Sequence, residues 1–253
     1  MLTFPVPTSN AEKQQMINII KNKLINKFGD QLIAIGAYGS IGRNTEMPYS
    51  DIEMHIVTND GFVQKSYEFV YDGFKIELNL RQKSDWIKRA KRIDDSWAIW
   101  AGSFIDISPI YDPTDFFRMN NQLPLDISED DIKAVMMEFM VWEPYETMGK
   151  IRNLVESEDC EFITFLAKDF AWQTAKLIGL ANKRYYTTRV STFKQSLGMN
   201  SKPTGYQELV TLLLRGNLQD IKKTYFSCED LWTGLNSWFQ ELGIEYETKH
   251  LPF

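Results

Sequence analysis

Residues 31–57 read QLIAIGAYGSIGRNTEMPYSDIEMHIV, and this stretch decides the fold of the first half of the chain. Residues 31–38 form an apolar run that ends at Gly39-Ser40, which is typical of a buried strand entering a turn. Residues 51–57 alternate in polarity, so they predict a second strand with Asp51 and Glu53 on one face. The sequence thus predicts two strands joined by a loop rich in small residues.

This loop and the second strand also carry a pattern typical of phosphate and metal chemistry. A Gly-Ser turn brings backbone N–H groups close to a phosphate, and Arg43 lies within loop reach as a phosphate clamp. The carboxylates of Asp51 and Glu53 suit one hard cation, and Mg²⁺ is the natural candidate. An isolated D-x-E pair is more often only a solvated strand face. Here the preceding turn, Arg43 and a third carboxylate at Glu77 favour a metal site.

A second constellation lies about a hundred residues further on, at Glu143, Glu146 and Lys150. In a helix over 131–153 these residues share one face, although Pro144 should kink it. By itself the pattern fits an ordinary surface ion pair. Transfer of a phosphoryl group to an acceptor hydroxyl, however, needs a base near that hydroxyl and a cation near the phosphates. Glu146 and Lys150 would supply both groups.

The order of elements predicts an α+β protein with two domains. Residues 1–126 should form a domain with a mixed β-sheet, and residues 127–253 a helical bundle. Asp72-Gly73 predicts a hairpin turn between two strands. The expected strands are 31–38, 51–57, 66–71, 74–80 and 104–111, and the expected helices are 11–28, 86–101, 131–153, 162–182, 205–215, 218–225 and 228–242.

Composition narrows the classes of partner. The 253 residues carry a net charge of −6 and no long Lys/Arg tract, which disfavours a nucleic-acid partner. No apolar run approaches the roughly 20 residues of a membrane span, and the N-terminus lacks a signal-peptide pattern, so we expect a cytoplasmic protein without a membrane partner. With two histidines and two widely spaced cysteines, a zinc site is disfavoured, and His55 is interpreted as a structural or solvent-facing residue rather than a metal ligand.

The motif G-S-I-G-R at residues 39–43, followed by S-D-I-E at 50–53, resembles the signature of the DNA polymerase β-type nucleotidyltransferase superfamily. Segments over nearly the whole chain are similar to the aminoglycoside 4′-nucleotidyltransferase family, among them ISPIYD at 107–112, GKIRN at 149–153 and YYTT at 185–188. The resemblance implies transfer of AMP from Mg-ATP, or a nucleoside monophosphate from another triphosphate, to the 4′-hydroxyl of kanamycin-type aminoglycosides. It also implies antibiotic resistance as the outcome.

The same resemblance implies roles for individual residues. Asp51 and Glu53 would hold Mg²⁺, and Glu146 would be the catalytic base. Lys150 would contact the nucleotide and assist catalysis. The triphosphate would contact the side chains of Ser40, Arg43, Ser50, Lys150 and Thr188. Glu77, Glu143 and Glu146 would bind the aminoglycoside.

The family works as a homodimer with shared active sites, so Glu146 and Lys150 would act on the neighbouring subunit's nucleotide. One departure concerns Trp142, which stands where the family carries an acidic residue and which we expect to pack against a sugar ring. Two alternatives stay open at this point. In the first, the enzyme transfers the nucleotide to a different small alcohol or to a protein side chain. In the second, the chain is a catalytically silent nucleotide-binding protein of the same fold.

Overall fold

The computed structural model describes residues 4–251 and 253, and the chain divides into two compact units. Unit 1 comprises Met1–Arg92 and Trp100–Asp126, and unit 2 comprises Ile93–Ile99 and Ile127–Phe253. The segment Ile93–Ile99 therefore belongs with the C-terminal helices, whereas the sequence places it in the first domain.

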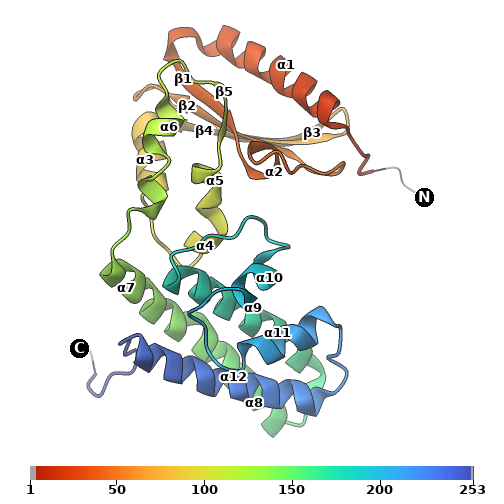
Figure 1. Ribbon diagram of the computed structural model, residues 1–253, viewed down its shortest axis with the longest axis vertical. Coiled ribbons are helices and arrows are strands. Elements are labelled where there is room, and N and C mark those ends of the chain that lie inside the picture. The colour runs from red at the N-terminus through yellow and green to blue at the C-terminus, as the bar shows by residue number, and fades with distance from the viewer. Residues whose placement is uncertain (1–3, 252) are drawn as a thin grey trace. The chain divides into compact units, whose positions relative to one another are not determined.

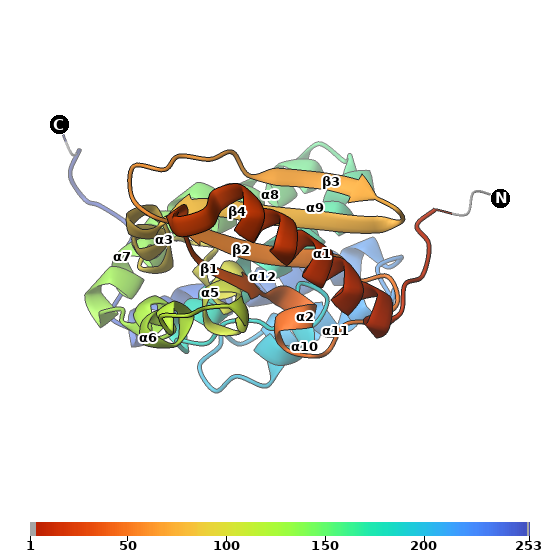
Figure 2. The same cartoon turned by 90° about the horizontal axis from the view of Figure 1, so that it is seen from above.

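In the described part of unit 1, five strands form one mixed sheet in the order β3-β4-β2-β1-β5. Figure 2 shows β3, β4, β2 and β1 side by side. Strands β2 and β4 are parallel, and the other neighbours are antiparallel. The strands are β1 (Leu32–Ala37), β2 (Ile52–Thr58), β3 (Tyr67–Tyr71), β4 (Phe74–Gln82) and β5 (Ser108–Tyr111). The prediction of a mixed sheet is confirmed. The predicted hairpin turn is also confirmed, because Asp72 and Gly73 both have positive φ angles between β3 and β4.

Helices cover both faces of this sheet (Figure 1). Helix α1 (Asn10–Phe28) begins at a Ser9–Glu12 capping box and buries Met16, Ile17 and Leu24 against one face. The opposite face packs on a second cluster that includes Trp86, Phe104 and Phe116. The elements on that side are α3 (Lys83–Ala90), α5 (Gly102–Ile105) and α6 (Phe116–Asn120), while α2 (Gly39–Gly42) follows β1 directly.

Two sequence predictions in this region are wrong. The helix expected over 86–101 ends at Ala90, and α4 (Trp97–Trp100) starts anew because the Asp94 carboxylate accepts the Ser96 N–H at 3.0 Å. The strand expected from residue 104 starts only at Ser108, since residues 102–105 form the helical turn α5. Apolar periodicity alone did not distinguish these short turns from longer elements.

Unit 2 is helical, and its central helix α9 packs against α7, α8, α10, α11 and α12. Its helices are α7 (Glu129–Met140), α8 (Glu146–Glu156), α9 (Ile163–Ala181), α10 (Thr192–Leu197), α11 (Tyr206–Leu214) and α12 (Ile221–Glu241). The two helices predicted at 218–225 and 228–242 are one helix, because Ser227 and Cys228 are buried residues of α12 rather than a break. The C-terminal helical bundle is thus confirmed.

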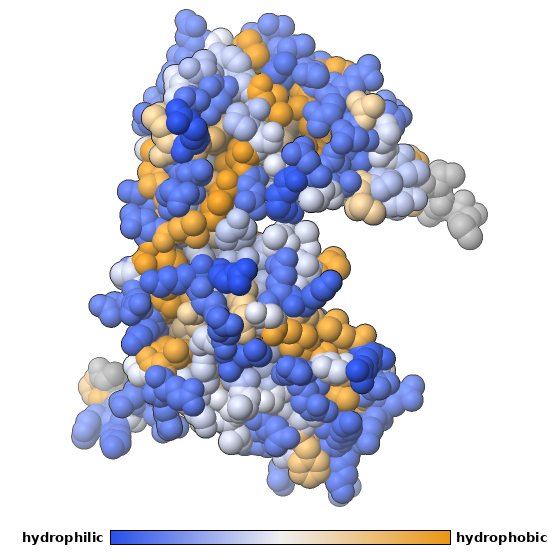
Figure 3. All heavy atoms as spheres, viewed as in Figure 1, coloured by the Kyte–Doolittle hydropathy of each residue, from blue (hydrophilic) through white to orange (hydrophobic). Residues whose placement is uncertain are grey.

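The surfaces that Figure 3 shows are mostly hydrophilic in both units, with hydrophobic patches between the polar residues. No helix in the described part of the chain combines the length and the apolar character that crossing a bilayer requires.

Candidate active site

The Gly39-Ser40 turn lies directly against one of the predicted metal ligands. Gly39 has a φ angle of +65°, and a Cβ atom at this position would overlap the carboxylate of Glu53. A Cβ at Gly42 would likewise meet the backbone carbonyl oxygens of Ala37 and Asp106. Both glycines are therefore required for α2 to fit between β1 and its neighbours, and this fit places the turn beside the D-x-E strand.

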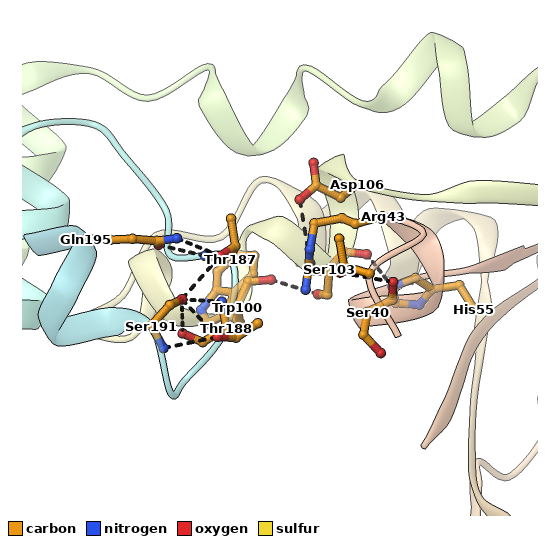
Figure 4. Close-up of polar contacts among 11 residues, drawn as sticks. Ser40, Arg43, His55, Trp100, Ser103, Asp106, Thr187, Thr188, Ser191 and Gln195 are labelled. Carbon is orange, nitrogen blue, oxygen red and sulfur yellow. Dashed lines mark hydrogen bonds and ion pairs between the residues drawn. The ribbon is translucent and has the colours of Figure 1, made fainter. Parts of the chain in front are cut away.

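Arg43 ends this turn and is held by an acidic partner that the sequence did not reveal. Its Nη1 lies 3.7 Å from Oδ2 of Asp106, and the two side chains are only 17% and 21% exposed (Figure 4). Asp106 comes from the segment before β5, more than sixty residues away in sequence. The ion pair fixes the direction of the guanidinium group, whose planar donors suit phosphate oxygens.

The loop between the turn and β2 is anchored by a buried lysine. Lys13 is 1% exposed, and its ammonium group donates to the carbonyl oxygens of Thr8 (2.8 Å), Met47 (3.1 Å) and Pro48 (3.4 Å). The Ser50 N–H donates to the Met47 carbonyl, and the Met47 N–H donates to the Ser50 hydroxyl oxygen, both at 2.9 Å. Helix α1 thereby fixes the loop that carries Ser50.

The carboxylates of Asp51, Glu68 and Glu77 lie around the Lys75 ammonium group near the start of β2 and β4. Asp51 precedes β2, and Glu53 lies opposite Glu77 in the parallel register of β2 and β4. The Lys75 ammonium lies 3.0 Å from Asp51 and from Glu68, and 4.0 Å from Glu77. The sequence put Lys75, Glu77 and Asn79 on one polar face without giving Lys75 a role.

Glu77 is oriented by neutral donors as well. The Tyr38 hydroxyl donates to Glu77 Oε1 at 2.9 Å, and the Asn79 amide donates to the same oxygen at 2.7 Å. The Asn79 amide also donates to the Tyr38 hydroxyl at 2.6 Å, so the three side chains form a closed network. The carboxylate of Glu77 is fixed before any ligand arrives.

The environment of Glu53 fits a cation. Burial raises the pKa of Glu53 to about 7, and the negative charges of Asp51 and Glu77 act in the same direction. A divalent cation would relieve this repulsion, and carboxylate oxygens are ligands that Mg²⁺ prefers. Among residues 4–251 and 253, no three Asp, Glu, His or Cys side chains form a ready-made metal cluster. Water and phosphate oxygens would complete the coordination of a metal held by Asp51 and Glu53.

His55 shares this strand but belongs to the core. Its ring stacks on Tyr38 with 4.4 Å between centroids, and its Nε2 donates to the Ser103 carbonyl at 3.0 Å. Burial lowers the pKa of His55 to about 3, so the imidazole stays neutral. These contacts agree with the structural interpretation of this residue.

The acceptor half of the predicted site lies on unit 2. Glu146 begins α8, and its Oε1 lies 2.7 Å from the Lys150 ammonium one turn later. Both side chains are 57% exposed, and the hydrogen bond with Glu146 raises the pKa of Lys150. Both groups face solvent, so each is accessible to a ligand.

Pro144 is accommodated by a π-turn, Val141–Tyr145, rather than by a simple kink. One extra residue per turn removes the clash that the ring would cause in a regular α-helix, and the chain passes from α7 into α8 without a break. Glu143 lies in this π-turn, and its Oε2 accepts a hydrogen bond from the Gln173 amide of α9 at 2.9 Å.

Thr188 lies in a loop between α9 and α10 that its own side chains hold together (Figure 4). Its hydroxyl donates to Ser191 Oγ at 2.8 Å and accepts the Ser191 N–H at 3.0 Å. The Thr187 N–H donates to Gln195 Oε1 at 3.0 Å. The exposed Thr188 hydroxyl therefore has a fixed position.

The predicted site residues thus fall into two groups, each held within its own unit. Unit 1 carries the residues predicted for triphosphate, metal and part of the acceptor, namely Ser40, Arg43, Ser50, Asp51, Glu53 and Glu77. Unit 2 carries Glu143, Glu146, Lys150 and Thr188. The sequence missed the residues that orient them, which are Lys13, Tyr38, Lys75, Asn79, Asp106 and Gln173. Only the strand alternation of Lys75, Glu77 and Asn79 signalled any of these in advance.

Comparison with known proteins gives a consistent result. Residues 114–245 match the family model described as the KNTase C-terminal domain. The chain is 30% identical over 250 residues to an aminoglycoside nucleotidyltransferase (4′) of Staphylococcus aureus and equally to one of Bacillus sp., covering 98% of this chain and 99% of each relative. Its fold is similar to that of a nucleotidyltransferase-like protein from Exiguobacterium sibiricum 255-15, with a TM-score of 0.54, 15% identity, and coverage of 92% of this chain and 77% of that one.

Proposed function

Because this chain belongs to the aminoglycoside 4′-nucleotidyltransferase family, we propose that it transfers AMP from Mg-ATP to the 4′-hydroxyl of kanamycin-type aminoglycosides. The chain is a nucleotidyltransferase. We propose that ATP is the nucleotide, Mg²⁺ the metal and a kanamycin-type aminoglycoside the acceptor. We also propose that the reaction takes place in the cytoplasm and gives antibiotic resistance.

The environment of Glu53 is the main support for the proposed binding of Mg²⁺ and a nucleoside triphosphate. Its half-buried carboxylate lies against the Gly39 turn, and desolvation, followed by the charges of Asp51 and Glu77, raises its pKa to about 7. Such a group accepts either a proton or a cation, and the adjacent turn offers N–H groups for the phosphates that arrive with the cation. Mg²⁺ bound to Asp51 and Glu53 would neutralise phosphate charge and orient the triphosphate.

The residues of the chain supply the remaining roles. Glu146 takes the proton of the drug hydroxyl, whose oxygen forms a bond with the α-phosphorus as the bond to pyrophosphate breaks. Arg43 and Lys150 offset the charge that develops on the phosphates. The hydroxyl groups of Ser40 and Ser50 donate to phosphate oxygens, and that of Thr188 does so once it releases its hydrogen bond to Ser191. Positioning and electrostatics thus provide most of the rate enhancement.

A cationic acceptor suits the carboxylates of Glu77, Glu143 and Glu146, because an aminoglycoside carries several ammonium groups. Trp142 is 68% exposed, so its ring is available to pack on a sugar. We propose that the chain acts as a homodimer, in which Glu146 and Lys150 of one subunit serve the nucleotide of the other. Membrane and nucleic acid have no part in this reaction.

Mass spectrometry tests the proposal. Kanamycin, tobramycin and amikacin are incubated with Mg-ATP, and NMR locates the modified hydroxyl. The proposal requires addition of one AMP at the 4′-hydroxyl and release of one pyrophosphate. A screen of small alcohols and proteins with radiolabelled ATP would detect a different acceptor. Complete absence of transfer with bound ATP would instead indicate a silent nucleotide-binding protein.

A further inference from the structure

Gln173 is a buried polar residue that the reaction described above does not use. It lies in α9 and is 7% exposed. Its amide nitrogen donates two hydrogen bonds of 2.9 Å, one to Oε2 of Glu143 and one to Oγ1 of Thr147. Both acceptors lie on the segment that carries Glu146, one before it and one after it. Gln173 therefore links α9 to the acidic end of the predicted acceptor site.

The other end of the amide has no such partner. Oε1 of Gln173 is buried and has no hydrogen-bond partner within the described residues. Leaving a buried acceptor unsatisfied is unfavourable, and an apolar side chain of similar size would avoid that cost. If α9 needed only packing here, Leu or Met would serve better. The hydrogen bonds of the amide nitrogen are thus the feature that explains a glutamine at this position.

The exposed position of Glu143 on the π-turn explains why its carboxylate needs a hydrogen-bond donor to hold it in place. Pro144 is buried beside α9, and Glu143 itself is an exposed residue on the turn. A free glutamate side chain has several rotamers, and fixing one of them costs conformational entropy when a ligand binds. The Gln173 amide already fixes the Glu143 rotamer in the absence of ligand, so ligand binding loses less conformational entropy. It holds one carboxylate oxygen and leaves the other for the ligand.

We propose that Gln173 is a positioning residue that fixes the Glu143 carboxylate for an ammonium group of the acceptor. This inference rests on the proposed function, since it assigns Glu143 to aminoglycoside binding. Gln173 acts through Glu143 and leaves proton transfer to Glu146. Its loss should therefore weaken drug binding without slowing the chemical step.

The test replaces Gln173 by methionine, which keeps the length of the side chain and removes both hydrogen bonds. The KM for kanamycin should rise roughly five- to tenfold, while kcat and the KM for ATP change less than about twofold. Thr174→Val is the matched control, because Thr174 is the next residue of α9, is fully buried, and donates only to the Phe170 carbonyl. This control should lower thermal stability similarly and leave the KM for kanamycin unchanged.

A double-mutant cycle separates positioning from a general effect on the fold. Glu143→Ala should raise the KM for kanamycin at least as much as Gln173→Met, and the double variant should show no further rise. An unchanged KM in Gln173→Met, an equal rise in Thr174→Val, or additive effects in the double variant would each overturn the inference while the proposed function stands. If the wild-type protein neither binds kanamycin by calorimetry nor adenylylates it, the proposed function fails and this inference fails with it.

Discussion

Replacing Glu53 with glutamine should stabilise the metal-free protein, and by more at high pH than at low pH. Burial, followed by the charges of Asp51 and Glu77, raises the pKa of Glu53 to about 7 from its ordinary value of 4.5. The folded state therefore binds this proton more tightly than the unfolded chain does. The resulting stabilisation is complete below pH 4.5 and is lost as the pH rises through 7.

The size of the effect follows from the two pKa values. A tenfold change in proton affinity is worth about 1.4 kcal/mol, so the ionised Glu53 carboxylate costs about 3 kcal/mol above pH 7. Glutamine has the shape of the protonated side chain and carries no charge at any pH. Glu53→Gln should thus be more stable than wild type by about 1 kcal/mol at pH 5 and by about 3 kcal/mol at pH 8.

Urea unfolding in EDTA, followed by circular dichroism at pH 5, 6, 7 and 8, measures this difference. Glu68→Gln is the control, because Glu68 contacts the same Lys75 but is 64% exposed. Its effect should stay within about 1 kcal/mol at every pH, as expected for an exposed ion pair. Adding Mg²⁺ at pH 8 should make wild type more stable than Glu53→Gln, since only wild type retains both proposed metal ligands. A stability difference between Glu53→Gln and wild type that does not vary with pH would refute the reasoning.

Three further predictions concern the groups around this site. Glu146→Gln should lower kcat by about 10²–10⁴ with little change in ATP binding, and near-normal turnover would exclude Glu146 as the base. Gly39→Ala should destabilise the protein by about 2 kcal/mol, because its φ angle is +65° and its Cβ would displace the Glu53 carboxylate; an unchanged urea midpoint would contradict this. Lys13→Met should cost about 3 kcal/mol and increase amide exchange in residues 44–50, since the backbone carbonyl groups of Thr8 and Met47 lose their donor; unaltered exchange there would argue against its anchoring role.

The sequence predicted elements best where a local signal had only one physical explanation. Asp72-Gly73 closes the hairpin between β3 and β4, because these residues set the backbone conformation of the turn themselves. Prediction failed at residues 91–96, where the Asp94 carboxylate accepts the Ser96 N–H, and at residues 226–227, where α12 continues without a break. At Ser227 a polar residue is buried within α12, and apolar periodicity does not reveal that.

The same distinction applies to the candidate site. The D-x-E pair and Glu146 with Lys150 were visible because their members are two or four residues apart on regular elements. Asp106 reaches Arg43, and Gln173 reaches Glu143, only because distant segments pack together. Residues that carry out chemistry often leave a local pattern. Residues that orient them usually leave none, since any sufficiently close element can supply a hydrogen bond.

The carboxylates of Asp51, Glu53 and Glu77 show why composition alone says little about a site. Asp51 is neutralised by Lys75 at 3.0 Å, and Glu77 is held by Tyr38 and Asn79. Glu53 instead is half-buried beside both of these carboxylates, and desolvation and their charges raise its pKa. A cation that binds here therefore gains most of its electrostatic stabilisation from Glu53, while Asp51 must first share or release Lys75. Metal affinity should thus depend on pH through Glu53 and on ionic strength through the more exposed pair of Asp51 and Lys75.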